Sequence, residues 1–350
     1  MKNFKFNWQK IGEVVDFDKN EKHIGCADLL KAQLGNYIVV GGGSNFPNGN
    51  VTVGGKRTLN KKIYLFYADN DKIEQVDSID FSYPFSNGAT TTDDNNIYHI
   101  TANDKNGSDI VKFSIDNNKL SFTIIDSLPF PMENIILEFF EDTLIFGCGK
   151  INNELSRTLY RYNLSSKTLE TFSYFPGNER GMCLSTIYDN NLIVYGGGAS
   201  VTYNDGFKYD FANKKWEKLA PLSIKEKSYS LLGADWIRLN DDTMLVTGGF
   251  NNKLWKYAVA KLSTLQGDDL ERFRKYYFSM PIHEYNWNKE VFVYNIKENT
   301  WQIVATLPYA APCGHALLKI DDNIYSLMGE IKPAVRTPNI YHSKINFKDE

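Results

Sequence analysis

The chain has 350 residues, a formal net charge of −3 and 42% hydrophobic residues. This length supports one large domain or two medium ones, and the small negative charge argues against broad electrostatic binding to nucleic acid or to an anionic membrane. The first residues lack the apolar run of a signal peptide, and no stretch approaches the length of a membrane-spanning helix. We therefore expect a cytoplasmic protein without a nucleic-acid or membrane partner, and the sequence leaves the oligomeric state open.

The cysteines do not have the spacing of a metal site or of a disulfide framework. They are far apart and lie in apolar or glycine-containing segments, so we expect small buried side chains with reduced thiols and no bound metal. A catalytic thiol would need a nearby histidine, and this combination occurs once, at Cys313 and His315. The four positions are Cys26, Cys148, Cys183 and Cys313.

A repeat of roughly fifty residues runs through the chain, which is the period of kelch propellers. In each unit an apolar strand ends at a pair of small residues, and strands with alternating apolar and polar residues follow. Counting the strand before the pair, each unit holds four antiparallel strands, so the sequence predicts an all-β fold, a six-bladed kelch-type β-propeller, as a single domain over residues 1–350. The small-residue pairs are Gly41-Gly42, Thr101-Ala102, Gly147-Cys148, Gly196-Gly197, Gly248-Gly249 and Met328-Gly329.

Two segments depart from this repeat. Residues 253–290 interrupt the fifth unit, and within them "GDDLERFRKYYF" has helical apolar spacing, so a small helical insertion is expected there. The sixth unit lacks its fourth strand, whereas the N-terminal "FKFNWQKIGEVV" resembles the fourth strands "ENTWQIVATLP" and "KKWEKLAPLS". We therefore expect residues 4–11 to form the outer strand of the last blade and to close the ring.

Antiparallel pairing places the loop before each first strand and the loop after each second strand on one face, around the central channel. In "SLMGEIKPAVRT" three charged residues, Glu330, Lys332 and Arg336, follow the strand. The positions aligned with Glu330 in the other units hold Gly43, Asn103, Gly149, Gly198 and Phe250. These charges either form a site at the channel mouth or are ordinary solvated loop charges. Other polar candidates on this face are Ser44, Lys56, Lys150, Asn252, His23, Asn87, Ser228 and His315.

The segments "GEIKPAVRT" and "VTGGFNNKLW", with the insertion that follows, resemble the N-acetylneuraminate epimerases, which are kelch propellers of six blades. The early "VVGGGSNFPNGNVTVGGKRTLNKKIYLF" is similar to a block of a cyclically permuted branch of that family. This resemblance implies interconversion of the α and β anomers of free N-acetylneuraminate without a cofactor. It implies catalytic roles for Glu330 and Arg336, and weaker substrate-binding roles for Lys332, Asn251, Arg57, Asn45 and Arg180.

Other functions are compatible with a propeller. A non-catalytic kelch propeller could bind a sugar or a protein, and it would need no charged group at the channel mouth. A sialidase should contain S-x-D-x-G-x-x-T-W boxes, which are absent, and the 5 histidines show no ligand spacing for a copper oxidase.

Overall fold

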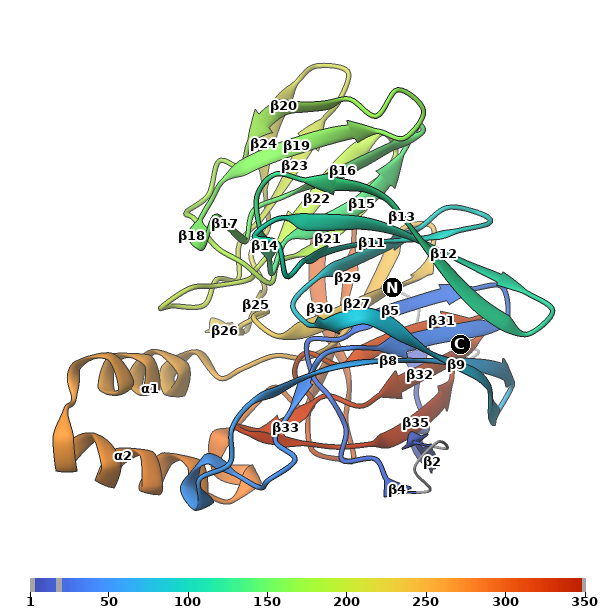
Figure 1. The fold of residues 1–350 in the computed structure, drawn as a ribbon. Helices are drawn as coiled ribbons and strands as arrows, with labels where there is room; N and C mark the ends of the chain where they lie inside the picture. Colours follow the sequence, from blue (N-terminus) through green and yellow to red (C-terminus); the bar gives the residue numbers. More distant parts are fainter. Residues whose placement is uncertain (1–3, 17–20, 348–350) are drawn as a thin grey trace.

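The computed structural model describes residues 4–16 and 21–347. Within these ranges the chain forms antiparallel sheets and one helical insertion (Figure 1). The prediction of an all-β chain is confirmed, and the arrangement is that of a β-propeller.

Six sheets of the described chain share a plan of four strands in up-and-down order, in which β2 (Gln9–Glu13), from the N-terminus, is the outer strand of the sixth. The first sheet has a fifth strand, β7 (Ser44–Asn45), which also pairs with β8. The first sheet contains β5 (Leu30–Leu34), β6 (Tyr37–Gly41), β8 (Thr58–Asp69) and β9 (Lys72–Phe85), and the second contains β10 (Ala89–Thr92), β11 (Ile97–Ala102), β12 (Ser108–Asp116) and β13 (Lys119–Leu128). The third contains β15 (Ile136–Phe140), β16 (Thr143–Gly147), β19 (Thr158–Asn163) and β20 (Leu169–Tyr174), and the fourth contains β21 (Leu184–Tyr188), β22 (Asn191–Tyr195), β23 (Gly206–Asp210) and β24 (Lys215–Leu219). The fifth contains β27 (Ala234–Asn240), β28 (Thr243–Gly248), β29 (Glu290–Asn295) and β30 (Thr300–Thr306), and the sixth contains β31 (Ala316–Ile320), β32 (Asn323–Leu327), β35 (Asn339–Lys344) and β2 (Gln9–Glu13).

Short strands and 3₁₀ turns lie outside the main strands of these sheets. They are β1 (Phe4–Lys5), β3 (Val15–Asp16), β4 (Glu21–Lys22), β7 (Ser44–Asn45), β14 (Met132–Glu133), β17 (Lys150–Ile151), β18 (Glu154–Leu155), β25 (Ser223–Ile224), β26 (Lys227–Ser228), β33 (Glu330–Lys332), β34 (Val335–Arg336) and β36 (Asn346–Phe347), with the 3₁₀ turns η1 (Val51–Val53) and η2 (Ile282–Tyr285).

The hydrophobic core lies between neighbouring sheets. The second strands are continuous apolar runs, as in β28 and β32, and are fully buried because both of their faces contact another sheet. The outer strands are more exposed, as in β24, where three of five residues are exposed and only the last is buried. Six clusters of buried side chains in the described chain each join two adjacent sheets. The first strands contact one another in the order β5, β10, β15, β21, β27, β31 and again β5.

A chain of backbone hydrogen bonds links the sheets just before their first strands. The amide of Asn87 donates to Asp28 (3.0 Å), that of Asn134 to Asn87 (2.7 Å) and that of Met182 to Asn134 (2.8 Å). The amide of Asp28 donates in turn to Gly314 (2.8 Å), and the amide of Gly314 to Gly233 (2.9 Å). All six residues have a positive φ, between 55° and 76°. We call these six residues, Asp28, Asn87, Asn134, Met182, Gly233 and Gly314, the inner belt.

The N-terminal segment differs in detail from the predicted outer strand at residues 4–11. β2 pairs with β35 over Gln9–Glu13, whereas Phe4–Lys5 pairs with β36 in a separate two-stranded ribbon. Trp8, between the two strands, is buried and packs edge-on against Tyr309 at 5.9 Å. Burial of this large ring interrupts the pairing, since the backbone that carries it leaves the line of the sheet.

The interruption of the fifth sheet contains two helices, α1 (Asn252–Thr264) and α2 (Gly267–Ser279), which pack against each other and project from the sheets (Figure 1). The sequence pattern identified the α2 helix but not α1. Trp255 fixes α1 to the sheets because its ring stacks on Phe250 at 4.8 Å and its Nε1–H donates to the carbonyl of Ala199 (3.0 Å). No helix of the described ranges is long and apolar enough to cross a membrane.

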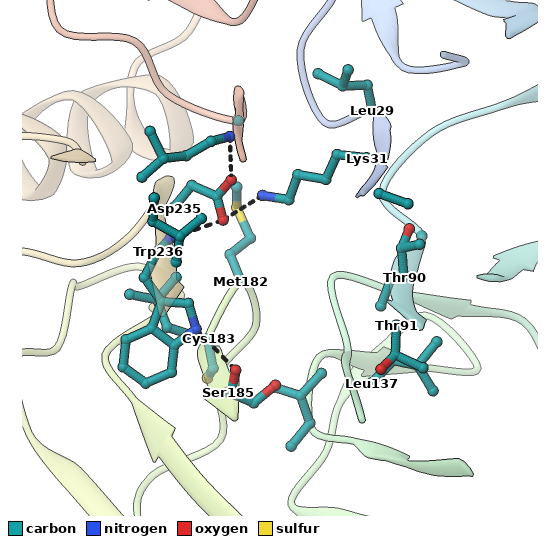
Figure 2. A pocket seen from close by; sticks show the side chains of 18 of the residues that line it. Leu29, Lys31, Thr90, Thr91, Leu137, Met182, Cys183, Ser185, Asp235 and Trp236 are labelled. Atoms are coloured by element: carbon teal, nitrogen blue, oxygen red, sulfur yellow. Dashed lines mark hydrogen bonds and ion pairs between the residues drawn. The ribbon is translucent and has the colours of Figure 1, made fainter. Parts of the chain in front are cut away.

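A cavity of about 450 Å³ lies along the axis, lined by residues on and next to the first strands (Figure 2). Across it the ammonium of Lys31 contacts Asp235 at 2.6 Å, and the Leu317 amide donates to the same carboxylate at 2.8 Å. Glu138 also lines this cavity and accepts a hydrogen bond from Ser185 Oγ at 2.6 Å. Burial raises the pKa of Glu138 from 4.5 to about 7, against the opposing effects of the Ser185 hydrogen bond and the Arg238 charge.

The raised pKa of Glu138 makes stability depend on pH. The folded state binds a proton here between pH 4.5 and about 7, where the unfolded chain has lost it, so the free energy of unfolding falls as pH rises through this window. At about 1.4 kcal/mol per unit of pKa, the loss from this group is on the order of 3 kcal/mol. In urea denaturation, Glu138→Gln should remove this part of the difference in stability between pH 5 and pH 8.

The exposed Glu298→Gln variant serves as the control and should keep the wild-type dependence on pH. If the wild-type and Glu138→Gln proteins lost the same stability between the two pH values, the assignment of a proton to Glu138 would be wrong.

Candidate functional site

Glu330 lies where the chain leaves the second strand of the sixth sheet. It begins β33, which pairs with β34 in a tight hairpin that brings Glu330 opposite Arg336. The backbone of Glu330 also pairs with Cys313, donating to its carbonyl at 2.9 Å and accepting from its amide at 2.8 Å. The carboxyl is thus fixed by backbone bonds on two sides, just in front of the first strand of its own sheet.

Glu330 and Arg336 form a buried ion pair. Arg336 Nη1 donates to Glu330 Oε1, which also accepts from the Ala334 amide at 2.9 Å. The Arg336 side chain is 6% exposed and that of Glu330 is 16% exposed. Burial raises the pKa of Glu330 above its ordinary value, and the nearby Asp28 charge adds to this, whereas Arg336 and the Ala334 hydrogen bond oppose it.

A second arginine meets Arg336 at Ser44. Arg336 Nε donates to the Ser44 carbonyl at 3.2 Å, and Arg57 Nε donates to the hydroxyl of the same residue at 2.9 Å. Arg57 Nη2 also donates to Ser86 Oγ at 2.9 Å, and the Phe46 ring lies 5.1 Å from the Arg336 guanidinium carbon. Two guanidinium groups from the first and sixth sheets therefore converge next to Glu330, which is an arrangement suited to an anionic ligand.

Asp28 is the residue of this cluster that the sequence did not identify. Its Oδ2 lies 4.0 Å from Arg57 Nη2, and it lines the axial cavity. Burial raises the pKa of the Asp28 carboxyl, opposed by the charges of Arg336, Arg57 and Lys31. The available signal was its place just before an apolar first strand, where four of the other five units hold asparagine or glycine and one holds Met182.

Three predicted residues lie around this cluster. Asn45 is buried, with its Nδ2 3.8 Å from Cys26 Sγ. Lys332 Nζ donates to the Met280 carbonyl at 3.0 Å, which ties the β33–β34 hairpin to the helical insertion. Asn251 caps α1, since its Oδ1 accepts from the amide of Leu254 at 3.0 Å. The insertion thus borders the Glu330 hairpin, and η2 contacts β33.

Arg180 belongs to a different set of contacts. Its side chain is 1% exposed and is paired with Asp205, and its guanidinium carbon lies 3.8 Å from the centre of the Tyr203 ring. It also donates to the carbonyls of Gly196 (3.2 Å) and Asn178 (2.9 Å). These contacts hold loops of the third and fourth sheets together and use the donors that a substrate would need.

The strand register corrects the alignment of Glu330 with other units. In the sixth sheet, Leu327 pairs with Ala316, the first residue of the first strand. In their own sheets, Gly41, Gly147 and Gly248 likewise pair with the first residue of the first strand, so they are equivalent to Leu327. Glu330 is therefore equivalent to Ser44, Lys150 and Asn251 in the first, third and fifth sheets, one residue later than the predicted Gly43, Gly149 and Phe250. In the second and fourth sheets the predicted equivalents, Asn103 and Gly198, agree with the register. Hydrogen-bond register decides equivalence, whereas the glycine pairs used in the alignment do not all occupy the same strand position.

The thiol near a histidine is not arranged for catalysis. Cys313 is buried, and burial raises its pKa well above the ordinary value, so the reactive thiolate is disfavoured. His315 Nε2 is bonded to Thr247 Oγ1 at 3.0 Å, in a fully buried position. The described ranges contain no group of three or more His, Cys, Asp or Glu residues that could hold a metal ion.

Comparison with known proteins gives consistent matches. The chain is 30% identical to an N-acetylneuraminate epimerase of Salmonella arizonae over 233 residues, which is 63% of this chain and 58% of that protein. It is 26% identical to N-acetylneuraminate epimerase 1 of Escherichia coli over 219 residues, 59% of this chain and 57% of that protein. The chain thus spans less than two thirds of the length of these curated relatives.

A solved structure of YjhT has a similar fold, with a TM-score of 0.55 and 23% sequence identity, over 63% of this chain and 66% of that one. The family model described as N-acetylneuraminate epimerase matches residues 126–349, which include the β33–β34 hairpin and the helical insertion. The match extends over more than half of the chain, and the chain therefore belongs to the N-acetylneuraminate epimerase family.

Proposed function

We propose that this protein is an isomerase that interconverts the α and β anomers of free N-acetylneuraminate, without a cofactor. The observation that carries the proposal is the buried Glu330–Arg336 pair in the hairpin after β32. Membership of the epimerase family supports the choice of substrate, a sugar that carries a carboxylate.

Anomer exchange needs a proton-transferring group and a fixed cation. In the ring form, a base removes the proton of the anomeric hydroxyl while the ring oxygen receives a proton and its bond to the anomeric carbon breaks. After rotation about the adjacent carbon–carbon bond, the same transfers run in reverse and close the ring on the other face of the carbonyl. A carboxyl group such as Glu330 can serve in both directions, since it accepts a proton as an anion and donates it as an acid.

Arg336 would hold the carboxylate of the substrate. A guanidinium matches a carboxylate with two parallel hydrogen bonds, and Arg57 at the same serine adds a second positive charge. When the substrate carboxylate pairs with Arg336, the arginine stabilises the anionic form of Glu330 less, and the proton affinity of Glu330 rises. Substrate binding would thereby prepare Glu330 for proton transfer.

Among the other residues, we propose that Arg57 and Asn45 contribute to the substrate site from the first sheet. Lys332 and Asn251 would act at its border with the helical insertion, where their described contacts lie. We assign Arg180 a structural role, because its donors are occupied within its own loops.

The finer architecture belongs to the same proposal. The six four-stranded sheets of the described chain would be the blades of one kelch propeller, closed by β2 on β35, with an insertion over residues 253–290. A permuted order of blades is supported by the family match, which begins at residue 126, since the preceding blades would occupy another place in the relatives.

A non-catalytic propeller that binds a sugar or a protein is the alternative. The burial of two opposite charges at the channel mouth favours an enzyme, because an interaction surface needs no buried ion pair there. Calorimetric titration with N-acetylneuraminate tests for a protein-binding module, which would take up none. The rate of anomer exchange separates an enzyme from a propeller that only binds the sugar.

Replacement of the proposed proton-transfer group is the direct test. Glu330→Gln should lower the catalysed rate of anomer exchange by about 10²–10⁴-fold, because the amide cannot accept and return a proton. Exchange is followed by NMR from the pure α anomer, and affinity by calorimetry, which should be retained because Arg336 remains. The matched control is Glu154→Gln, in the exposed β17–β18 hairpin of the third sheet, which should exchange anomers at the wild-type rate. An active Glu330→Gln protein would refute the proposed role.

The proposed carboxylate clamp predicts a different result. Arg336→Gln should weaken binding of N-acetylneuraminate about 10–100-fold, as expected for loss of charge-assisted hydrogen bonds. It should also raise the pH at which Glu330 loses its proton, since Arg336 opposes the effect of burial. Calorimetry measures the affinity, with Arg272→Gln on the exposed face of α2 as the control. Unchanged affinity would exclude Arg336 as the anchor of the substrate.

A further inference from the structure

We propose that Asp28 is a positioning residue for Glu330: the carboxylate of Asp28 shares the positive charge of Arg336 with Glu330 and so makes it easier for Glu330 to take up a proton. This inference rests on the proposed role of Glu330 in proton transfer. It is carried by the place of Asp28 in the inner belt, by the space that Gly314 leaves for its carboxyl, and by the charges that surround it.

The fold does not need a charge at position 28. The inner belt repeats one backbone conformation and one kind of hydrogen bond, and its other members are Asn87, Asn134, Met182, Gly233 and Gly314. Asparagine and glycine adopt positive φ most readily, and they occupy four of these five places. Asp28 is the one charged residue of the belt, so its carboxylate adds a property that the belt itself does not require.

The carboxyl of Asp28 has a defined place. A Cβ atom at Gly314 would lie 2.5 Å from Asp28 Oδ1, so only glycine leaves room for the carboxyl there. The backbone is held on both sides, because the Asp28 amide donates to Gly314 and its carbonyl accepts from Asn87. Asp28 Oδ2 lies 4.0 Å from Arg57 Nη2. The side chain therefore stays at the mouth of the axial cavity, beside the arginines of the candidate site.

The charges that act on this carboxyl come from four elements. Arg336 of β34, Arg57 before β8 and Lys31 of β5 are positive, and Glu330 of β33 is negative. Burial raises the pKa of the Cys313 thiol, next to β31, and the charges of Glu330 and Asp28 add to this, whereas Arg336 opposes it.

Without Asp28, burial would oppose the effect of Arg336 on Glu330 with no help from a second carboxylate. Arg336 alone stabilises the ionised form of Glu330 and makes it a weak base, whereas the Asp28 charge raises the pKa of Glu330. Two carboxyl groups on one arginine titrate as a coupled pair, in which the loss of one charge changes the proton affinity of the other. Glu330 would thus keep its proton to a pH at which it can serve as acid and as base.

The test measures Glu330 without a substrate. In the full chain labelled with ¹³C at the glutamate carboxyl, the Glu330 signal is assigned from its absence in Glu330→Gln, and its titration midpoint is read by NMR. Asp28→Asn and Asp28→Gly place in the belt residue types that it already contains, so both should fold. We expect the midpoint to fall by about one pH unit in both, which is a tenfold loss of proton affinity.

The matched control is Asn134→Gly, which changes the belt at an equivalent place and removes no charge. Its Glu330 midpoint should equal that of the wild type. Unchanged midpoints in both Asp28 variants, or an equal shift in Asn134→Gly, would overturn the inference. If the wild type proved unable to exchange sialic acid anomers, the proposed function would fail, whereas the midpoints would still decide the coupling of Asp28 to Glu330.

The pH profile of anomer exchange gives the second readout. The part of the kcat–pH profile that is set by the titration of Glu330 should move to lower pH in Asp28→Asn, by the same amount as the NMR midpoint. KM should stay near the wild-type value because Arg336 is intact. A loss of kcat that is equal at every pH would indicate a structural effect alone and would overturn the positioning role.

Discussion

The hydrogen bonds of the inner belt are the constraint on which the site depends. Each joins the residue before one first strand to its counterpart in the next sheet, so the first strands are held in a fixed order around the axis. Positive φ turns the chain sharply into each first strand, and asparagine, aspartate and glycine accept this conformation at little cost. The side chains of the belt are therefore fixed at the mouth of the axial cavity.

A second set of backbone hydrogen bonds holds the β33–β34 hairpin next to the inner belt. In the first, fourth and sixth sheets, the third residue after the second strand pairs with the segment just before the first strand, as Ala27 does with Ser44 and Cys313 with Glu330. Ser44 and Glu330 are equivalent in the repeat, and they lie in neighbouring sheets. Arg336 joins them by bonding to both, so the site is built where the first and sixth sheets meet.

Electrostatics at this junction is a balance between burial and nearby charges. Burial disfavours the anionic forms of Glu330 and Asp28, while Arg336, Arg57 and Lys31 favour them. A buried ion pair of this kind contributes little to stability, since its desolvation offsets its attraction. Its presence near Asp28, which lines the axial cavity, is better explained by chemistry, in which one charge can be exchanged for that of a ligand.

The sequence by itself determined the repeat, the strand types and the charged hairpin. Strand periodicity is a local property, and a run such as "LIVY" is buried wherever the sheets stack. The motif "GEIKPAVRT" likewise identified Glu330 and Arg336, because both lie in one short segment.

Only the tertiary structure decided which other residues join them. Asp28, which the sequence did not identify, lies beside the expected Arg57, whereas Arg180, which the sequence grouped with Arg57, is paired with Asp205 in another pair of sheets. The register of the first, third and fifth sheets also moved the equivalents of Glu330 by one residue, to Ser44, Lys150 and Asn251. These results depend on hydrogen bonds between residues far apart in the chain, and such bonds leave no periodic signal in the sequence.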